Sequence, residues 1–242
     1  MTLILDSAHP AAVEGRTLFS KTVVDPKYAD RLLKRCDNRN KIGATIQKGR
    51  YRGYAIYSLA LEERASCPRT CPMWLGCYGN GVYQQRVQRF RHGAGLIDRL
   101  DEELQSLTEA HPNGVAIRLH LLGDFWSVAY VRAWLRWLKL YPNLFVFGYT
   151  AREPGTRIGN ALTDARHRQW KRFAVRLSNG TGRKTTRVLE DIPNTPTLGK
   201  AVVCPEQTGR VKNCAACGLC WNTTRQIAFV DHAALNAAGG VA

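Results

Sequence analysis

Apolar residues along the chain form short continuous runs that alternate with helically spaced sets. The runs predict strands at 51–60, 115–125 and 144–150, around Val175 and Val202, and a last short strand at 226–232. The helically spaced sets predict helices at about 83–110, 128–141 and 159–171. Strands that alternate with helices are typical of a parallel sheet with helices packed outside it. The pattern therefore predicts an α/β fold.

Several residues with chemically useful side chains follow the predicted strands. Parallel sheets bind ligands beyond the carboxyl ends of their strands, so we expect a site there. His120 and Asp124 are the catalytic candidates, and Arg118 alternates with His120, which predicts that both face the same side of the sheet. A charged residue in such a strand needs a partner, such as a cofactor carboxylate. The further cofactor-binding candidates at the strand ends are Gly123, Asp124, Tyr149, Thr150 and Ser178.

The composition is that of a folded protein with a large excess of positive charge. The 242 residues are 45% hydrophobic, and 35 Lys+Arg against 19 Asp+Glu give a formal net charge of +16. No apolar run reaches the length of a membrane span, and the N-terminus lacks the pattern of a secretory signal. These features predict a cytoplasmic protein without a membrane partner. In that reducing compartment, the 8 cysteines are expected to bind metal rather than form disulfides.

The C-terminal half of the cysteines carries the stronger metal pattern. Cys214, Cys217 and Cys220 are separated by two residues each, and Cys204 follows a predicted strand. Two-residue gaps let successive thiolates turn toward one soft metal ion or cluster. Three cysteines at paired two-residue gaps favour an iron–sulfur cluster, with zinc as the alternative.

The N-terminal cysteines have a looser spacing. Cys67, Cys71 and Cys77 follow the first predicted strand of the core, and Cys36 lies upstream. If Cys36 joins them, the site is closed by four thiolates and is structural. If it does not, one metal position is open for a substrate or cofactor. Cys36 is otherwise a small hydrophobic residue at a helix end.

Two basic clusters with interleaved aromatic residues predict a nucleic-acid partner. Neither cluster matches a named DNA- or RNA-binding motif, and no phosphate-binding loop or complete GxGxxG is present. The clusters are Arg31, Lys34, Arg35, Arg39, Lys41, Lys48, Arg50 and Arg52, and Arg166, Arg168, Lys171, Arg172, Arg176, Arg183, Lys184 and Arg187.

The combination of four motifs resembles the gene-product-88 family of phage and plasmid proteins, over about 44–231. The motifs are SCPRTCP with GCYG, RLHLLGDFWS with YVRAW, FGYT, and CPEQTG with CAACGLCW. If the protein is phage-encoded, its compartment is the host cytosol. The layout is in turn similar to that of radical S-adenosylmethionine enzymes, in which a strand leads into a cysteine loop and a later strand ends in a small-residue and acid turn.

That second resemblance implies a mechanism. It implies a [4Fe-4S] cluster on Cys67, Cys71 and Cys77, whose open iron is chelated by S-adenosylmethionine, and it places the amine-binding turn at Gly123 and Asp124. The C-terminal cysteines resemble an auxiliary cluster, and a reductant protein would be a partner. The usual spacing is CxxxCxxC, whereas the second gap here has five residues.

We therefore expect an incomplete parallel β/α barrel with a cysteine-rich, metal-binding C-terminal extension. The expected division is a basic segment at 1–50, an α/β core at 51–203, and the second cysteine cluster with a tail at 204–242. The expected function is that of an iron–sulfur enzyme of the radical S-adenosylmethionine type acting on a nucleic acid or nucleotide. The alternative is a non-enzymatic nucleic-acid-binding protein with two closed four-cysteine sites, the first completed by Cys36.

Overall fold

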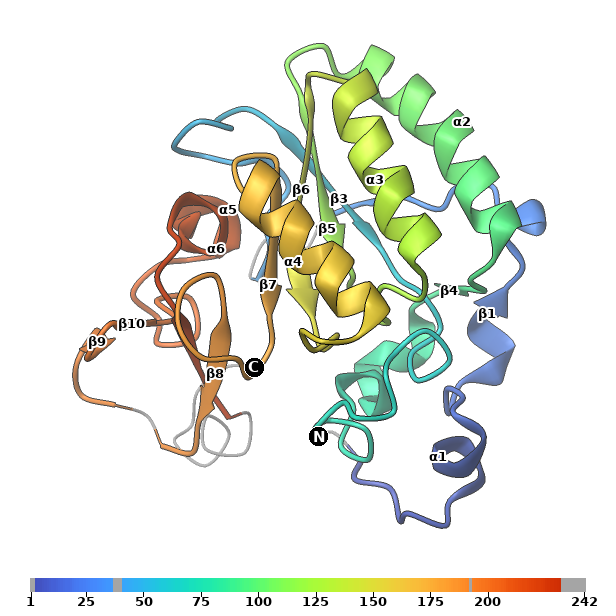
Figure 1. The fold of residues 1–242 in the computed structure, drawn as a ribbon, viewed down its shortest axis with the longest axis horizontal. Helices are drawn as coiled ribbons and strands as arrows, with labels where there is room; N and C mark the ends of the chain where they lie inside the picture. Colours follow the sequence, from blue (N-terminus) through green and yellow to red (C-terminus); the bar gives the residue numbers. More distant parts are fainter. Residues whose placement is uncertain (1–2, 37–40, 192, 232–242) are drawn as a thin grey trace.

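A computed structural model describes residues 3–36, 41–191 and 193–231, and its main element is a five-stranded sheet (Figure 1). The strand order is β2-β3-β5-β6-β7; β2 is antiparallel to β3, and the other neighbours are parallel. The parallel strands thus lie side by side in the order of the sequence. Their bounds are Lys34–Arg35 (β2), Ala55–Leu59 (β3), Val115–Leu119 (β5), Leu144–Thr150 (β6) and Phe173–Leu177 (β7).

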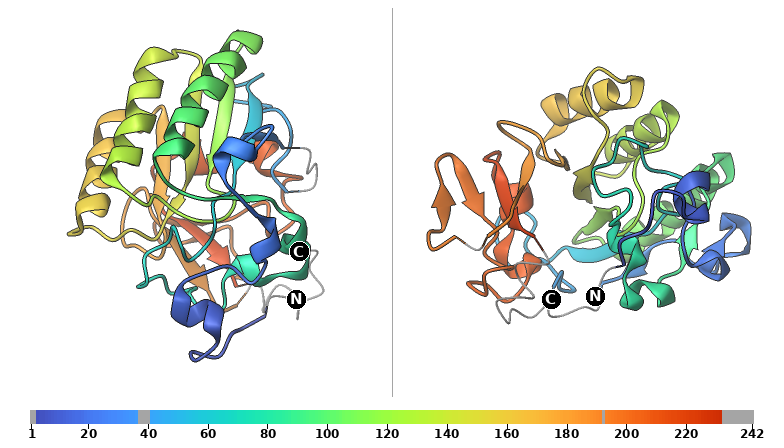
Figure 2. Two further views of the ribbon diagram at one scale, coloured as in Figure 1. Left: turned by 90° about the vertical axis from the view of Figure 1, so that its right-hand side faces the viewer. Right: turned by 90° about the horizontal axis from the view of Figure 1, so that it is seen from below.

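Three helices connect the parallel strands and cover one face of this sheet (Figures 1 and 2). They are α2 (Ala94–Ala110), α3 (Val128–Leu140) and α4 (Arg157–Gln169). The hydroxyls of Ser127 and Thr156 cap the first turns of α3 and α4. The α/β fold with parallel strands that the sequence predicts is confirmed.

Segments from both ends of the chain cover the opposite face of the sheet. The short helices α5 (Cys214–Cys217) and α6 (Leu219–Asn222) pack there. The amides of Cys214 and Ala215 donate to the carbonyls of Lys41 and Ile42, at 2.8 and 2.9 Å. The basic N-terminal segment and the C-terminal cysteine segment are therefore joined to each other and to the core.

A second sheet lies beside the β7 side of the main sheet, where Leu177 bridges to Thr185 (Figure 2). Its order is β8-β11-β10-β9, with bounds Thr186–Leu189 (β8), Thr197–Leu198 (β9), Ala201–Val203 (β10) and Ile227–Val230 (β11). Because β11 pairs with both β8 and β10, this sheet crosses the expected boundary at residue 203.

The remaining elements are short. They are β1 (Val23–Val24) paired with β4 (Arg89–Phe90), helix α1 (Pro10–Glu14), and the 3-10 turns η1 (Ser20–Thr22), η2 (Pro26–Tyr28), η3 (Tyr78–Asn80) and η4 (Val82–Arg86). No helix in the described ranges is long and apolar enough to cross a membrane.

Two predicted elements are shorter than expected. The helix predicted from residue 83 begins at Ala94, because residues 82–86 form η4, residues 89–90 form β4, and Gly93 precedes the helix with φ 151°. The strand predicted for 115–125 ends at Leu119, and the chain turns at Gly123, whose φ is +83°. Apolar residues continue past both points, so periodicity alone did not mark these ends.

Candidate functional site

The first cysteine group lies in the loop that follows β3, at the carboxyl end of the parallel strands, as predicted. Burial raises the pKa of the Cys67 thiol well above its usual range, and the charges of Asp124, Cys77 and Cys71 raise it further. Burial also raises the pKa of Cys71, and it raises that of Cys77 to about 11. The three thiols therefore share one desolvated neighbourhood that opposes the thiolate form.

A buried network of charged side chains anchors this loop. Glu63 and Arg89 form a two-point ion pair, with Nε–Oε2 at 2.6 Å and Nη2–Oε1 at 3.2 Å. Arg89 also donates to the carbonyl of Gly79, and Arg64 donates to the carbonyl of Trp74 and to the side chain of Asn80. Buried hydrogen bonds from Arg64 and Arg89 therefore fix the loop on both sides of Cys77, at Trp74 and at residues 79–80.

Sequence reasoning missed these anchoring residues. Glu62, Glu63 and Arg64 are three consecutive charged residues that follow the buried strand β3 after two residues, and each is at most 3% exposed. Charged residues are rarely buried unless they are paired. A charged triplet at that position is a sequence feature that could have pointed to Glu63 and Arg64, whereas Arg89 lies outside it.

Asp124 links the first cysteine loop to the end of β6. Its Oδ1 accepts from the Thr150 hydroxyl at 2.7 Å, and its Oδ2 accepts from the Ala151 amide at 2.8 Å. Its own amide donates to the Ser66 hydroxyl oxygen at 3.2 Å. Burial raises the pKa of Asp124 to about 6, although the hydrogen bonds from Thr150, Ala151 and Phe125 favour the charged form.

Gly123 permits this close approach. Its φ is positive, and a Cβ there would stand 2.5 Å from the Ser66 hydroxyl and 2.7 Å from Leu61. The Gly-Asp turn therefore packs directly against the residue that precedes Cys67. Gly123, Asp124 and Thr150 are brought together with the first cysteine group. At Ser178, the described contact is a backbone one, from its amide to the Thr150 carbonyl at 2.8 Å.

His120 lies in the helix-covered core rather than beside the cysteine loop. It packs against Phe125 and Tyr130, and its Nε2 lies 3.0 Å from the Tyr130 hydroxyl. Burial lowers its pKa to about 3, so the ring is neutral at ordinary pH. The expectation that Arg118 and His120 face the same side is wrong, because β5 ends at Leu119 and strand alternation does not extend to His120.

The second cysteine group spans two short helices and the end of β10. Cys204 follows β10, Cys214 and Cys217 belong to α5, and Cys220 belongs to α6. Burial raises the pKa of Cys204 to about 12, with a further contribution from Cys220. Burial also raises the pKa of Cys214, to which Cys220, Glu206 and Cys204 add. These thiols lie close enough to influence one another, as their spacing predicts.

The cofactor residues proposed from the strand ends divide between the two cysteine groups. The Arg118 guanidinium carbon lies 4.5 Å from the centre of the Tyr149 ring. The Tyr149 hydroxyl donates to the Cys220 sulfur at 3.0 Å. Arg118 and Tyr149 therefore belong with the second group, whereas Gly123, Asp124 and Thr150 belong with the first. Alternation along β6 explains why Tyr149 and Thr150 face opposite sides of the sheet, and Gly123 and Asp124 lie in the turn beyond β5.

Cys36 is buried in the apolar cluster on the sheet face opposite the helices. Cys214 and Cys220 pack against the same cluster. This placement puts Cys36 with the C-terminal cysteines and gives no support to its role as the fourth ligand of the first group.

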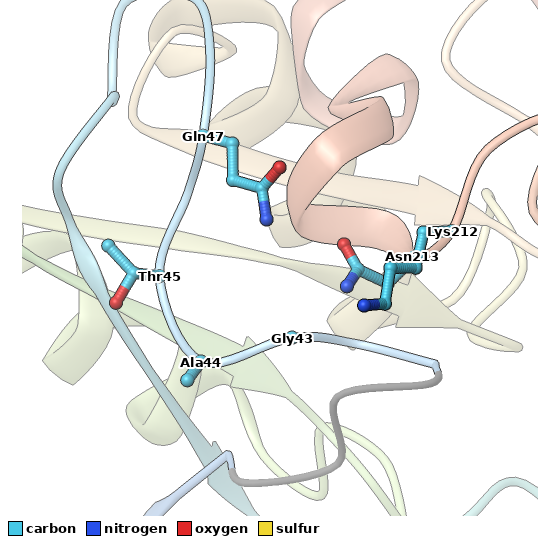
Figure 3. Close-up of a pocket in the computed structure, with 6 residues that line it drawn as sticks. All are labelled: Gly43, Ala44, Thr45, Gln47, Lys212 and Asn213. Carbon is cyan, nitrogen blue, oxygen red and sulfur yellow. The ribbon is translucent and has the colours of Figure 1, made fainter.

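Two pockets adjoin the cysteine groups. One of about 290 Å³ is lined by Pro68 and Thr70 of the first loop and by Arg152, Glu153, Thr156, Arg157 and Ile158. The other, of about 300 Å³, lies between residues 43–47 and Asn213, the residue before Cys214. Figure 3 shows the Gln47 side chain extending across this second pocket toward Asn213.

In the described residues, no three His, Cys, Asp or Glu side chains are arranged to hold a metal ion as they stand. The donor types fit a soft metal, and the thiols of each group are neighbours. The metal centres predicted from cysteine spacing therefore stay predictions.

Comparison with known proteins gives one family. The chain matches the family described as gene product 88 over residues 31–223. No curated protein and no solved structure matches the chain.

Proposed function

The chain belongs to the gene product 88 family, and we propose that it is an iron–sulfur enzyme of the radical S-adenosylmethionine type that acts on a nucleic acid or nucleotide. The observation that carries the proposal is the position of Cys67, Cys71 and Cys77. They follow the first parallel strand, share one neighbourhood with the Gly123–Asp124 turn, and adjoin a pocket. Four parallel strands in sequence order with helices on one face also support an incomplete β/α barrel.

In this proposal Cys67, Cys71 and Cys77 hold the catalytic cluster, and Cys204, Cys214, Cys217 and Cys220 hold a second one. When bound, the first cluster and S-adenosylmethionine supply one-electron chemistry at the open metal position. Arg64 and Arg89 hold the loop that carries the three thiols. Asp124 fixes the end of β6 against the loop.

Arg152 joins the first cysteine loop to the wall of the adjoining pocket. Its Nη2 donates to the Ser66 carbonyl at 2.6 Å, and its Nε donates to the Phe125 carbonyl at 2.7 Å. Arg157 lines the same pocket and is exposed. Two guanidinium groups there favour a ligand with a carboxylate or phosphate group, because arginine binds such groups through paired hydrogen bonds.

Metal analysis tests the proposal directly. Protein purified without oxygen is expected to contain iron and inorganic sulfide, and Cys71→Ala is expected to lose the iron of the first group. Cys36→Ala is the matched control and should retain that iron. Stoichiometric zinc without sulfide would end the proposal. If iron is present, failure of the dithionite-reduced protein to cleave S-adenosylmethionine would remove the enzyme class and leave an electron-transfer or sensing role.

The nucleic-acid part of the proposal rests on a basic surface at the amino end of the strands. Residues 41–61 and 165–189 contain no acidic residue. The two stretches meet where the Tyr51 hydroxyl donates to the Lys171 carbonyl. The exposed basic side chains around this contact are Lys48, Arg50, Arg52, Arg168 and Lys171.

In the structure, fewer residues of the second basic cluster lie on the surface than the sequence suggests. Arg166 is 6% exposed and Arg176 is fully buried, so neither adds to a surface patch. In the first basic cluster, Arg39 lies outside the described residues. The surface that we propose for the phosphate backbone is therefore formed by residues 48–52 and 168–171.

Salt dependence of binding tests this surface. Replacing Lys48, Arg50 and Arg52 together by Gln is expected to weaken binding of a labelled single-stranded DNA. The slope of log K against log salt should fall by roughly 0.7 for each phosphate that the variant no longer neutralises. The matched control replaces Arg132, Arg136 and Lys139, exposed on α3, by Gln and removes the same charge. Equal weakening in the two variants would show that net charge, and not this surface, drives binding.

A further inference from the structure

Arg176 is a fully buried arginine whose guanidinium contacts the second cysteine segment. Its Nε donates to the Cys220 carbonyl at 2.8 Å. Its Nη1 and Nη2 donate to four further carbonyls, those of Thr185, Leu219, Thr223 and Arg225. These bonds engage all the N–H groups of the guanidinium, and every acceptor is neutral.

Such a buried cation needs a negative charge close by. Burying an unpaired charge costs several kcal/mol even after relaxation. Within the described residues, none of the ion pairs includes Arg176. The Arg176 guanidinium contacts the Cys220 backbone, and the Cys220 sulfur accepts from the Tyr149 hydroxyl on the neighbouring strand. The nearest source of compensating charge is thus the cysteine group itself.

The neighbouring strands place two more residues at the same group. Tyr149 on β6 pairs in register with Arg176 on β7, and its hydroxyl donates to the Cys220 sulfur at 3.0 Å. Arg118 on β5 lies over the Tyr149 ring. Three adjacent parallel strands therefore present one cation, one hydroxyl donor and a second cation from the same face of the sheet.

We infer that Arg118 and Arg176 supply the counter-charge, and Tyr149 a hydrogen bond to the Cys220 sulfur, for an anionic thiolate metal centre on the C-terminal cysteines. This inference deepens the proposed function and rests on it. Four thiolates around Zn²⁺, or around a [4Fe-4S] cluster in its 2+ state, leave a net charge of about −2, by formal charge counting. Positive charge and hydrogen bonds at cluster sulfurs raise the reduction potential, so the three residues are positioning residues that adjust the centre electrostatically.

The experiment is a potentiometric titration, followed by electron paramagnetic resonance, of oxygen-free protein with both cysteine groups intact. Tyr149→Phe and Arg118→Gln are expected to shift the potential of one centre to more negative values while iron and sulfide content stay unchanged. Tyr57→Phe is the matched control, because the Tyr57 hydroxyl hydrogen-bonds to His111 Nε2 at 2.8 Å, outside both groups. It should leave both potentials unchanged. Unchanged potentials in Tyr149→Phe and Arg118→Gln would overturn the inference.

Arg176 is tested by a pair of variants, since its removal also deprives five carbonyls of their donor. Arg176→Lys keeps the charge and should retain more metal on the second group than Arg176→Met. Equal metal loss in the two would show that Arg176 acts by its hydrogen bonds alone, which contradicts a counter-charge.

The metal and sulfide content tests the proposed function separately from the counter-charge. If the protein contains zinc and no sulfide, the iron–sulfur proposal fails. The counter-charge is then measured as the affinity for Co²⁺, through its thiolate absorption bands. Tyr149→Phe and Arg118→Gln are expected to weaken Co²⁺ binding roughly tenfold or more, as changes around metal ligands generally do. Unchanged Co²⁺ affinity would overturn the inference in that case.

Discussion

Replacing Glu63 by Gln is expected to lower the free energy of unfolding by about 3–5 kcal/mol, the usual loss when one partner of a buried ion pair is removed. Glu63 and Arg89 have side chains that are 1% and 0% exposed. The variant leaves the Arg89 guanidinium in the interior without its anion. The same change also loosens the link from Arg89 to Gly79, beside Cys77. Urea unfolding measures the loss.

Two further variants show whether the buried charge is the cause. Glu102→Gln removes one partner of the exposed Arg99–Glu102 pair and should change stability by less than about 0.5 kcal/mol. The double variant Glu63→Gln with Arg89→Met should recover part of the loss, because no unpaired charge remains. If Glu63→Gln costs no more than Glu102→Gln, the buried pair does not anchor the cysteine loop.

The second large effect is expected at Gly148, in the last register pair between β5 and β6. A Cβ at this position would lie 1.4 Å from the Leu119 carbonyl oxygen, which is backbone and has no rotamer by which to move away. Gly148 and Leu119 are register partners, so the two strands would have to separate. Gly148→Ala should therefore cost more than about 4–5 kcal/mol, or prevent folding. Soluble yield and thermal unfolding measure it.

Gly95→Ala is the matched control, for which the expected change in stability has the opposite sign. Gly95 lies in α2, is exposed, and has no atom within 4 Å of an added Cβ. Alanine there should stabilise the protein by roughly 0.5–1 kcal/mol, since glycine loses more backbone entropy in a helix. Comparable stability changes in the two variants would contradict the close approach of Gly148 and Leu119.

Long periodic segments were predicted well because their pattern reflects burial on one face. The run at 144–150 is β6 without change of bounds, and the helix predicted at 128–141 is α3 at Val128–Leu140. Two-residue strands such as β2 and β9 were not predicted. Such strands are too short to show an alternation and depend on a neighbour for their hydrogen bonds.

The candidate site was predicted in part. Loops after parallel strands must meet at one edge, and this placed the first cysteine loop and the Gly123–Asp124 turn together. At the carboxyl ends of the strands, the sequence did not predict which face of the sheet each side chain lies on. The Thr150 hydroxyl donates a hydrogen bond to Asp124 on one face of the sheet, and the hydroxyl of the adjacent Tyr149 donates one to the Cys220 sulfur on the other face.

The sequence by itself determined the α/β fold, the family, and the grouping of cysteines, because spacing and periodicity are local properties. Only the tertiary structure decided which basic side chains are buried and which are exposed on the surface. Arg89 and Arg176 are buried within the protein, whereas Lys48, Arg50 and Arg52 are exposed at the amino end of the strands. Whether an arginine is a surface charge or an internal hydrogen-bond donor depends on carbonyls and carboxylates distant along the chain. No local pattern records those partners.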